Sequence, residues 1–373
     1  MFAILTKILH LQIFRVNVRE SSANHQLLNF PGDTIMLSRV ADSMYWMCRY
    51  IERAENTARF IAVNFILALD APDPNGAQWM PLVMASGDNA LFEKKYGKAS
   101  RSADVPTKEN VMNFLMFDTD NPNSILSCLT AARENARSIR EVISSEMWEQ
   151  VNKFYLFVRD LATEARTDFQ IIANRFEMFT QMKLSAHLFE GVMAATMSHN
   201  EAWHFGRLGR FLERADKTSR ILDVKYFILL PDIADVGSSL DNIQWAAVLK
   251  SASALEMYRK IYHRIDHVHV ANFLLLDDVF PRSIRYAVSR AQRSLSSITG
   301  NPIGRFDTQP EKLIGKLHSD LEFTDIKEIF ATGLHEFLDD AQIKLNDIGA
   351  SIVETFFALR PVEMMQFQSQ HQN

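Results

Sequence analysis

Two short stretches carry the same pattern of arginines and carboxylates, and these residues are the ones that could do chemistry. They read RYIERAENTARF at 49–60 and RFLERADKTSRI at 210–221, with six of twelve positions identical. A carboxylate can move protons in acid–base catalysis, and an arginine can bind a carboxylate through two parallel hydrogen bonds. The pattern predicts a ligand-binding site or a structural charge network formed by Arg49, Glu52, Arg53, Glu55, Arg59, Arg210, Glu213, Arg214, Asp216 and Arg220.

Three interpretations of this pattern stay open at the level of sequence. On a helix the charged residues gather on one side, where ion pairs on a solvated face would contribute about 0.2–0.5 kcal/mol each. The charges agree between the stretches, whereas Asn56 and Ala58 align with Lys217 and Ser219. A solvated face tolerates many polar residues, so this selective agreement favours a buried network between the two helices, or a polar ligand cleft.

A third charged run, AARENARSIRE from residue 131, supplies secondary candidates. These are Arg133, Glu134, Asn135 and Arg137. The aligned stretch RAQRSLSSI, from residue 290, lacks their pattern. The difference indicates either a special role for one half of the chain or plain surface solvation.

Metal binding is the weakest interpretation. Carboxylates one turn apart occur in di-metal helical bundles, which also place Glu-x-x-His motifs on facing helices. No histidine stands at the matching positions here, and arginines crowd the carboxylates. The cluster His263, His267 and His269 has no equivalent in the other half, which favours a surface or packing role. We expect no metal site and no cofactor.

The elements that carry these residues form a repeated, all-helical structure. Glycine (13) and proline (11) are scarce, and VMNFLMFDTDNPNSI at 111–125 matches VANFLLLDDVFPRSI at 270–284 at eight of fifteen positions. We predict an all-α helical bundle of two tandem pseudo-symmetric repeats of about 160 residues that pack as one domain. The segments are a peripheral N-terminal extension or start-site artefact at 1–35, the repeats at 36–196 and 197–357, and a C-terminal tail at 358–373.

Each repeat is expected to follow the same order of helices. A long helix at 38–69 or 199–229 leads, and a second helix opens near the Gln-Trp pair. A third ends before the acidic stretch that precedes a proline. A fourth begins with Pro122 or Pro281 in its first turn, where the missing N–H costs nothing, and Asn121 is its N-cap in the first repeat. The basic stretch 93–110 is expected to be a loop.

Composition excludes several classes of protein. A net charge of −5 and a pI near 6.1 argue against a nucleic-acid-binding protein. Two cysteines allow no disulfide framework, which fits the cytoplasm, and both lie in predicted helices as buried, inert thiols. The apolar start MFAILTKILHLQIFRVNV is too interrupted to span a membrane. No phosphate loop, GxSxG, HExxH or GxGxxG motif occurs.

Long motifs give the chain a resemblance to the bacterial alpha-E family. They include MLSRVADSMYWMCRYIERAENTAR, NPNSILSCLTAARENARSIREV, HFGRLGRFLERADKTSRILDVKY and FLLLDDVFPRSI. The resemblance implies an all-helical protein of unestablished activity, in a family whose genes lie beside those of ATP-grasp-type ligases and transglutaminase-like cysteine proteases. Such neighbours imply a role in making or modifying a peptide or amide-linked metabolite. The family's Glu-Arg motifs correspond to Glu52, Arg53, Glu213 and Arg214.

Two hypotheses follow. The first is a non-catalytic helical partner of the ligase or transglutaminase-like protein, or a module that binds a peptide or carboxylate ligand; neither a nucleic acid nor a membrane is an expected partner. The second is an enzyme of amide or peptide chemistry that uses the Glu/Arg residues in a cleft between the repeats. The absence of a nucleophile–base pair favours the first. An open pocket around the Glu-Arg motifs would favour a ligand-binding or enzymatic role. Complete pairing of these residues inside a helix interface would favour a structural role.

Overall fold

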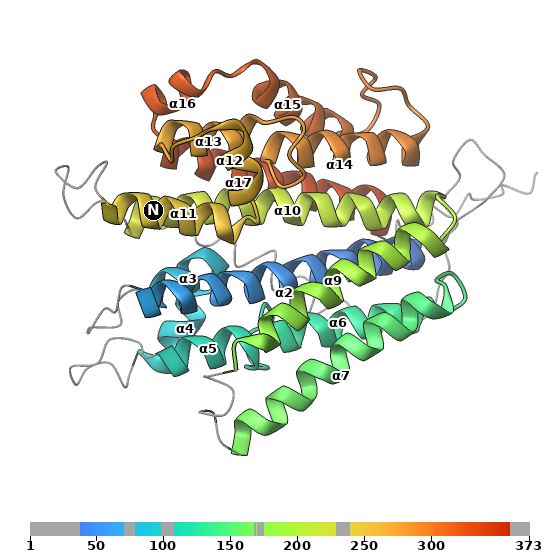
Figure 1. Ribbon diagram of the computed structural model, residues 1–373. Helices are drawn as coiled ribbons and strands as arrows, with labels where there is room; N and C mark the ends of the chain where they lie inside the picture. The colour runs from blue at the N-terminus through green and yellow to red at the C-terminus, as the bar shows by residue number, and fades with distance from the viewer. Residues whose placement is uncertain are drawn as a thin grey trace, which may run out of the picture.

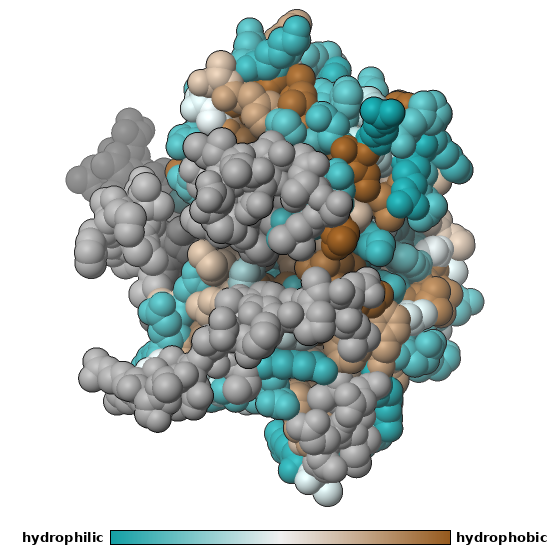
Figure 2. Space-filling view, turned by 60° about the vertical axis from the view of Figure 1, so that its left-hand side comes forward, coloured by the Kyte–Doolittle hydropathy of each residue, from teal (hydrophilic) through white to brown (hydrophobic). Residues whose placement is uncertain are grey.

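The computed structural model describes residues 38–70, 79–97, 108–167, 175–228 and 239–358, together with Phe169. These residues contain helices and no strand, which confirms the all-α prediction. None of the described helices is long and apolar enough to cross a membrane. Figure 2 shows one face, on which hydrophilic residues predominate and hydrophobic residues lie in separate patches. The predicted extension 1–35 lies outside the described residues, as does the predicted tail apart from Ala358.

Two long helices, α2 (Ser38–Asp70) and α10 (Glu201–Ile228), pack against each other through the middle of the molecule (Figure 1). Small residues let their backbones come close. A Cβ on Gly209 would lie 2.3 Å from the Tyr45 carbonyl oxygen, and one on Gly206 would lie 3.0 Å from the Cys48 sulfur. Most of the surface of both helices is buried, so their polar residues must be satisfied inside the protein.

Each central helix carries its own layer of long helices, on opposite sides in Figure 1. On one side α6 (Ile125–Ser138) packs on α2, α7 (Ser145–Thr167) on α6, and α9 (Glu177–Thr196) on both α7 and α2. On the other side α14 (Ile284–Thr299) packs on α10, α15 (Gln309–Phe323) on α14, and α17 (Leu334–Ile352) on both α15 and α10. The order of packing is the same on both sides.

The short helices complete the two sides and cross between them. Helix α3 (Met80–Ser86), which belongs to the α2 side by sequence, packs on α10, and α11 (Ser239–Ser251) packs on α2. The other short elements are α4 (Asn89–Tyr96), α5 (Lys108–Met116), α12 (Leu255–Ile261), α13 (His267–Leu276), α16 (Ile326–Thr332) and the π-helix η5 (Val353–Phe357). This exchange ties the two sides together.

The predicted start of the fourth helix is wrong in both halves. The α6 helix begins at Ile125 and α14 at Ile284, because the preceding serine is the N-cap. Ser124 Oγ accepts the N–H of Ser127 at 3.1 Å, and Ser283 accepts that of Tyr286 at 3.1 Å. The serine oxygen accepts a backbone N–H of the first turn that has no acceptor within the helix, a bond that a proline side chain cannot make. The Asn121 amide instead donates to the carbonyl of Phe114, in the preceding helix α5.

Two further expectations change. The predicted loop 93–110 is helical at its described ends, since α4 runs to Tyr96 and α5 starts at Lys108; residues 98–107 lie outside the described part. The second Gln-Trp pair lies inside α11, which begins five residues before it. The third helices, α5 and α13, end before the acidic stretches as predicted.

Candidate functional site

Four residues of the two long helices pair crosswise, and we call them the Glu–Arg quartet: Glu52 and Arg53 of α2, and Glu213 and Arg214 of α10. Arg214 donates Nε and Nη2 to the two oxygens of Glu52, at 2.8 and 2.9 Å. Arg53 donates Nε and Nη2 to those of Glu213, at 2.6 and 2.9 Å. Each helix thus supplies the arginine for the carboxylate of the other, in the two-bond geometry that makes such pairs strong.

The quartet is buried, so the solvated-face interpretation is wrong. Glu213 is 0% exposed, Arg214 5% and Glu52 6%. A buried charge costs several kcal/mol unless it is fully paired. Further donors complete the pairing, because Arg49 donates Nε to Glu213 at 2.9 Å and Arg282 donates Nη1 to Glu52 at 3.2 Å. All four carboxylate oxygens therefore accept a hydrogen bond from a buried or half-buried arginine.

These surroundings keep both carboxylates ionised. Burial alone would raise the pKa of Glu213, but Arg53, Arg49 and Lys217 outweigh it and hold that pKa well below its usual range. Burial likewise opposes Arg214 and Arg282 at Glu52, and the arginines again prevail, so the pKa of Glu52 is lowered. A general acid or base works best with a pKa near the operating pH. Neither glutamate fits that role.

The two cysteines are also unsuited to catalysis. Both are buried and unpaired with each other. Burial raises the pKa of the Cys48 and Cys128 thiols to about 12. Since the thiolate is the nucleophile, such thiols are inert at neutral pH.

Four more predicted residues flank the quartet in local pairs. On α2, Arg59 donates Nε to Glu55 at 3.0 Å and Nη1 to the Ser251 carbonyl at 3.1 Å, at the end of α11. On α10, Arg220 donates Nε to both oxygens of Asp216 at 3.0 Å. These pairs extend the network along both helices and attach α11 to α2.

Arg210 is the one predicted arginine that does not contact a carboxylate of the central helices. Its Nη1 forms an ion pair with Glu190 of α9 at 2.9 Å, and its buried Nε has no hydrogen-bond partner in the described part of the chain. Its aligned counterpart, Arg49, instead bonds Glu213 and the Tyr45 hydroxyl. The structure therefore brings nine predicted residues into one interface, and the tenth is linked to it through Glu190, which also accepts from Arg214.

Sequence reasoning missed several members of the network. Arg282 donates to both Glu52 and Glu55, Asn123 accepts from Arg53 Nη1 at 2.5 Å, and Lys217 lies 3.3 Å from Asp216. Glu190 is another, and so is Asn56, which donates to Glu52 at 3.1 Å. One signal was available, because Arg282 and Asn123 occupy the same position in the aligned stretches 270–284 and 111–125.

Two small hollows open beside the quartet. One lies among α2, α9 and α10, and its most exposed lining residues are His187 and Glu190. The other is lined by Arg53, Asn123 and Lys217, among others. Each has room for about one water molecule, far less than the about 300 Å³ of an ordinary small-molecule site. The quartet thus does not line an open substrate cleft.

The secondary candidates lie apart from the quartet, on the outer side of α6. Arg133 donates Nε to Asn152 of α7 at 2.7 Å, and Arg137 donates to Glu134 at 2.9 Å. The Asn135 amide nitrogen is buried with no acceptor among the described residues. These residues bind α6 to α7 or face solvent, and the structure does not join them to the network.

The described residues contain no group of three or more histidine, cysteine, aspartate or glutamate side chains that could hold a metal ion. In the histidine cluster, His269 stacks on Tyr262 with ring centres 4.7 Å apart, and His267 meets Phe330 edge-on at 5.6 Å. His263 is exposed. Two of the three histidines therefore have packing contacts.

Comparison with known proteins places this sequence in a family. Residues 36–357 match the Alpha-E family, described as a predicted alpha-helical domain with a conserved ER motif, and the sequence ER occurs here at Glu52–Arg53 and Glu213–Arg214. Uncharacterised proteins of Mycobacterium bovis and Mycobacterium tuberculosis are 22% identical over 339 residues. That match covers 86% of this chain but 37% of theirs. No solved structure matches. The chain belongs to the Alpha-E family.

Proposed function

We propose that this protein is a non-catalytic helical module that binds a partner protein or peptide, in a system that makes or modifies peptides with an ATP-grasp-type ligase and a transglutaminase-like protein. One observation carries the proposal. The Glu–Arg quartet is paired crosswise inside the interface of α2 and α10, with all four carboxylate oxygens occupied. This pairing supports a motif that holds the two helices together over one that binds a substrate.

The same observation weighs against an enzyme of amide chemistry. Such an enzyme needs an acid or base with a suitable pKa and access to its substrate. The quartet carboxylates have pKa values held low by arginines, both thiols are buried, and the adjacent hollows hold about one water molecule.

We also infer that residues 36–196 and 197–357 are two copies of one unit. Three features support this inference. First, α6, α7 and α9 pack around α2 in the same order as α14, α15 and α17 pack around α10. The serine caps of α6 and α14 are alike. The quartet is reciprocal. Because these charged residues are buried between the two halves, a partner would bind on the outer surface of the module.

The mycobacterial relatives support a modular role. The chain spans 37% of their length, so the matching region is one part of a longer protein there. A unit that is joined to other sequence in some proteins is a reasonable candidate for binding a separate protein in another.

The test is a binding and activity experiment on the full chain. We would mix it with an ATP-grasp-type ligase from the same organism and analyse the mixture by size-exclusion chromatography with light scattering. We expect a complex, and no amide-forming or amide-cleaving activity from the chain alone. Turnover by the chain alone that is lost in Glu52→Gln, with folding intact, would establish the enzyme instead. Absence of any complex would contradict the proposed partner.

A further inference from the structure

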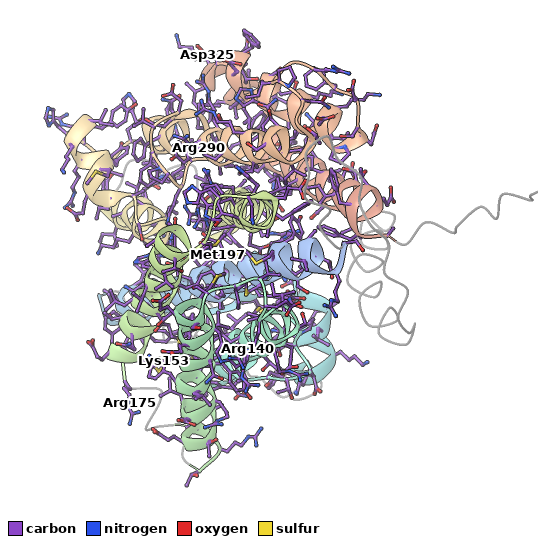
Figure 3. The ribbon with its side chains drawn as sticks, turned by 90° about the vertical axis from the view of Figure 1, so that its right-hand side faces the viewer. Arg140, Lys153, Arg175, Met197, Arg290 and Asp325 are labelled. Atoms are coloured by element: carbon purple, nitrogen blue, oxygen red, sulfur yellow. The ribbon has the colours of Figure 1, made fainter. Side chains whose placement is uncertain are left out.

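Three arginines of α10 and α14 lie near one another on the side of α10 that carries the ion pair with α9. We call Arg207 and Arg210 of α10 and Arg290 of α14 the arginine patch. Arg290 is labelled in Figure 3 on α14, above Met197 at the end of α9. None of these residues belongs to the Glu–Arg quartet.

Aromatic rings hold two of these guanidinium groups in place. Arg207 lies 4.6 Å from the ring centre of Trp203, and Arg290 lies 4.7 Å from that of Tyr286. Phe211 of α10 meets Tyr286 of α14 with ring centres 6.2 Å apart, which fixes the two helices to each other at this point. An arginine stacked on a ring keeps the edge of its planar group free for hydrogen bonds.

The patch has more positive charge than its neighbours neutralise. Within the described part of the chain, Arg207 and Arg290 make no ion pair, and Glu190 is the carboxylate that pairs with Arg210. Arg210 also keeps a buried Nε without an acceptor. Burial, together with Arg210 and Arg290 nearby, lowers the pKa of Arg207. Like charges held this close are relieved by an added anion.

Glu190 shows how a carboxylate binds at the edge of this face. One of its oxygens lies 2.9 Å from Arg210 Nη1 in an ion pair and the other accepts from Arg214 Nη2 at 3.4 Å, so one carboxylate bridges two arginines. Its side chain is 39% exposed, so the place lies at the surface. A second carboxylate, brought by another molecule, would find the same kind of donors on Arg207 and Arg290.

The charge of the patch selects the class of ligand. Arginines without an ion-pair partner suit a ligand that brings carboxylates, such as a peptide rich in acidic residues. The net charge of −5 argues against a nucleic acid.

We propose that the arginine patch binds an acidic peptide segment of a partner protein. The carboxylates of this segment would pair with Arg207 and Arg290. This inference rests on the proposed function, because it names the surface through which the module binds.

The experiment measures binding of a fluorescein-labelled peptide of alternating glutamate and leucine to the full chain by fluorescence anisotropy. We expect saturable binding, and a loss of at least about tenfold in affinity in the double variant Arg207→Gln/Arg290→Gln. A matched control is Arg140→Gln, since Arg140 also lies over a ring, 4.9 Å from the centre of Trp148, but on the α6–α7 side. This control should bind like the unchanged protein.

Several results would overturn the inference. They are no binding of the glutamate–leucine peptide, equal binding of a glutamine–leucine peptide, an equal loss in Arg140→Gln, or tighter binding of a uridine oligonucleotide. Circular dichroism of the double variant shows whether it is folded; if it is not, Arg290→Gln alone, on the half-buried end of the patch, is used. If the double variant forms a complex with the ligase as well as the unchanged protein does, the arginine patch is not the binding surface, and the proposed function is still supported.

Discussion

The two glutamates of the quartet occupy aligned positions, yet their surroundings differ. Glu213 accepts from two arginines of α2, Arg49 and Arg53. Glu52 accepts from one arginine of α10, Arg214, and from Arg282, which precedes α14. The counterpart of Arg49 on α10 is Arg210, which turns to α9 instead. The same sequence motif thus pairs its first arginine with the fully buried Glu213 at one end, and with the partly exposed Glu190 of α9 at the other.

The helices that cover the two ends account for the difference. At the Arg49 end, α17 lies close, since a Cβ on Gly349 would be 3.4 Å from Arg49 Nη1. In an alignment that pairs Met182 with Ile343, Glu190 corresponds to the buried Ser351. Because Ser351 has no carboxylate, Arg49 pairs with Glu213. On the other side, Arg210 pairs with Glu190 of α9. Arg282 is then the second arginine that bonds to Glu52.

The largest expected effect comes from removing the most buried carboxylate. Glu213→Gln leaves Arg49 and Arg53 buried without their acid, and breaking a buried pair from one side costs about 3–5 kcal/mol. Urea unfolding followed by circular dichroism measures this loss. The comparison variant is Glu190→Gln. This carboxylate is 39% exposed although its arginine partners are largely buried, so we expect a smaller loss of about 1–2 kcal/mol. Equal losses in the two variants would contradict the contrast between the fully buried Glu213 and the partly exposed Glu190.

Double-mutant cycles test the comparison directly. Arg49 bonds Glu213, so combining Arg49→Gln with Glu213→Gln should show a coupling energy of about 1–3 kcal/mol. The aligned pair Arg210 and Glu52 makes no direct hydrogen bond, and its coupling should be about 0.5 kcal/mol or less. Both energies come from urea unfolding of the single and double variants. Similar coupling at the two ends would show that Arg210 reaches Glu52 in solution.

The pKa of Glu213 gives a pH prediction whose sign is fixed. Its pKa in the folded state lies well below the ordinary value of about 4.3, so the unfolded state binds more protons in acid. The free energy of unfolding is therefore fully supported above about pH 5 and falls as the pH is lowered. One such group loses up to about 1.4 kcal/mol per pH unit below its unfolded pKa. Between pH 5 and pH 3.5, the unchanged protein should lose about 1 kcal/mol more than Glu213→Gln. A parallel decline in both proteins would mean that Glu213 is not held ionised by its arginines.

The positions of the long helices could be predicted from the sequence, whereas the partners of the charged side chains could not. The long helices were predicted at 38–69 and 199–229 and are observed at Ser38–Asp70 and Glu201–Ile228, because helical periodicity is a local property. Periodicity shows that Glu52 and Arg53 share a polar side, but not which surface that side meets. Arg282 reaches Glu52 across 230 residues of sequence, a contact that only the packing of α14 on α10 creates.

The caps of α6 and α14 should show the smallest effect, and there the two halves should agree. Ser124 and Ser283 are both 0% exposed and accept the same N–H, three residues on, at 3.1 Å. Loss of such a cap costs about 1 kcal/mol. We therefore expect Ser124→Ala and Ser283→Ala to lower the free energy of unfolding by about the same amount, within about 0.5 kcal/mol of each other. Thermal and urea unfolding would measure both variants. A clear difference would extend the asymmetry of the arginines to the helix ends; agreement confines it to the face where Arg210 meets Glu190.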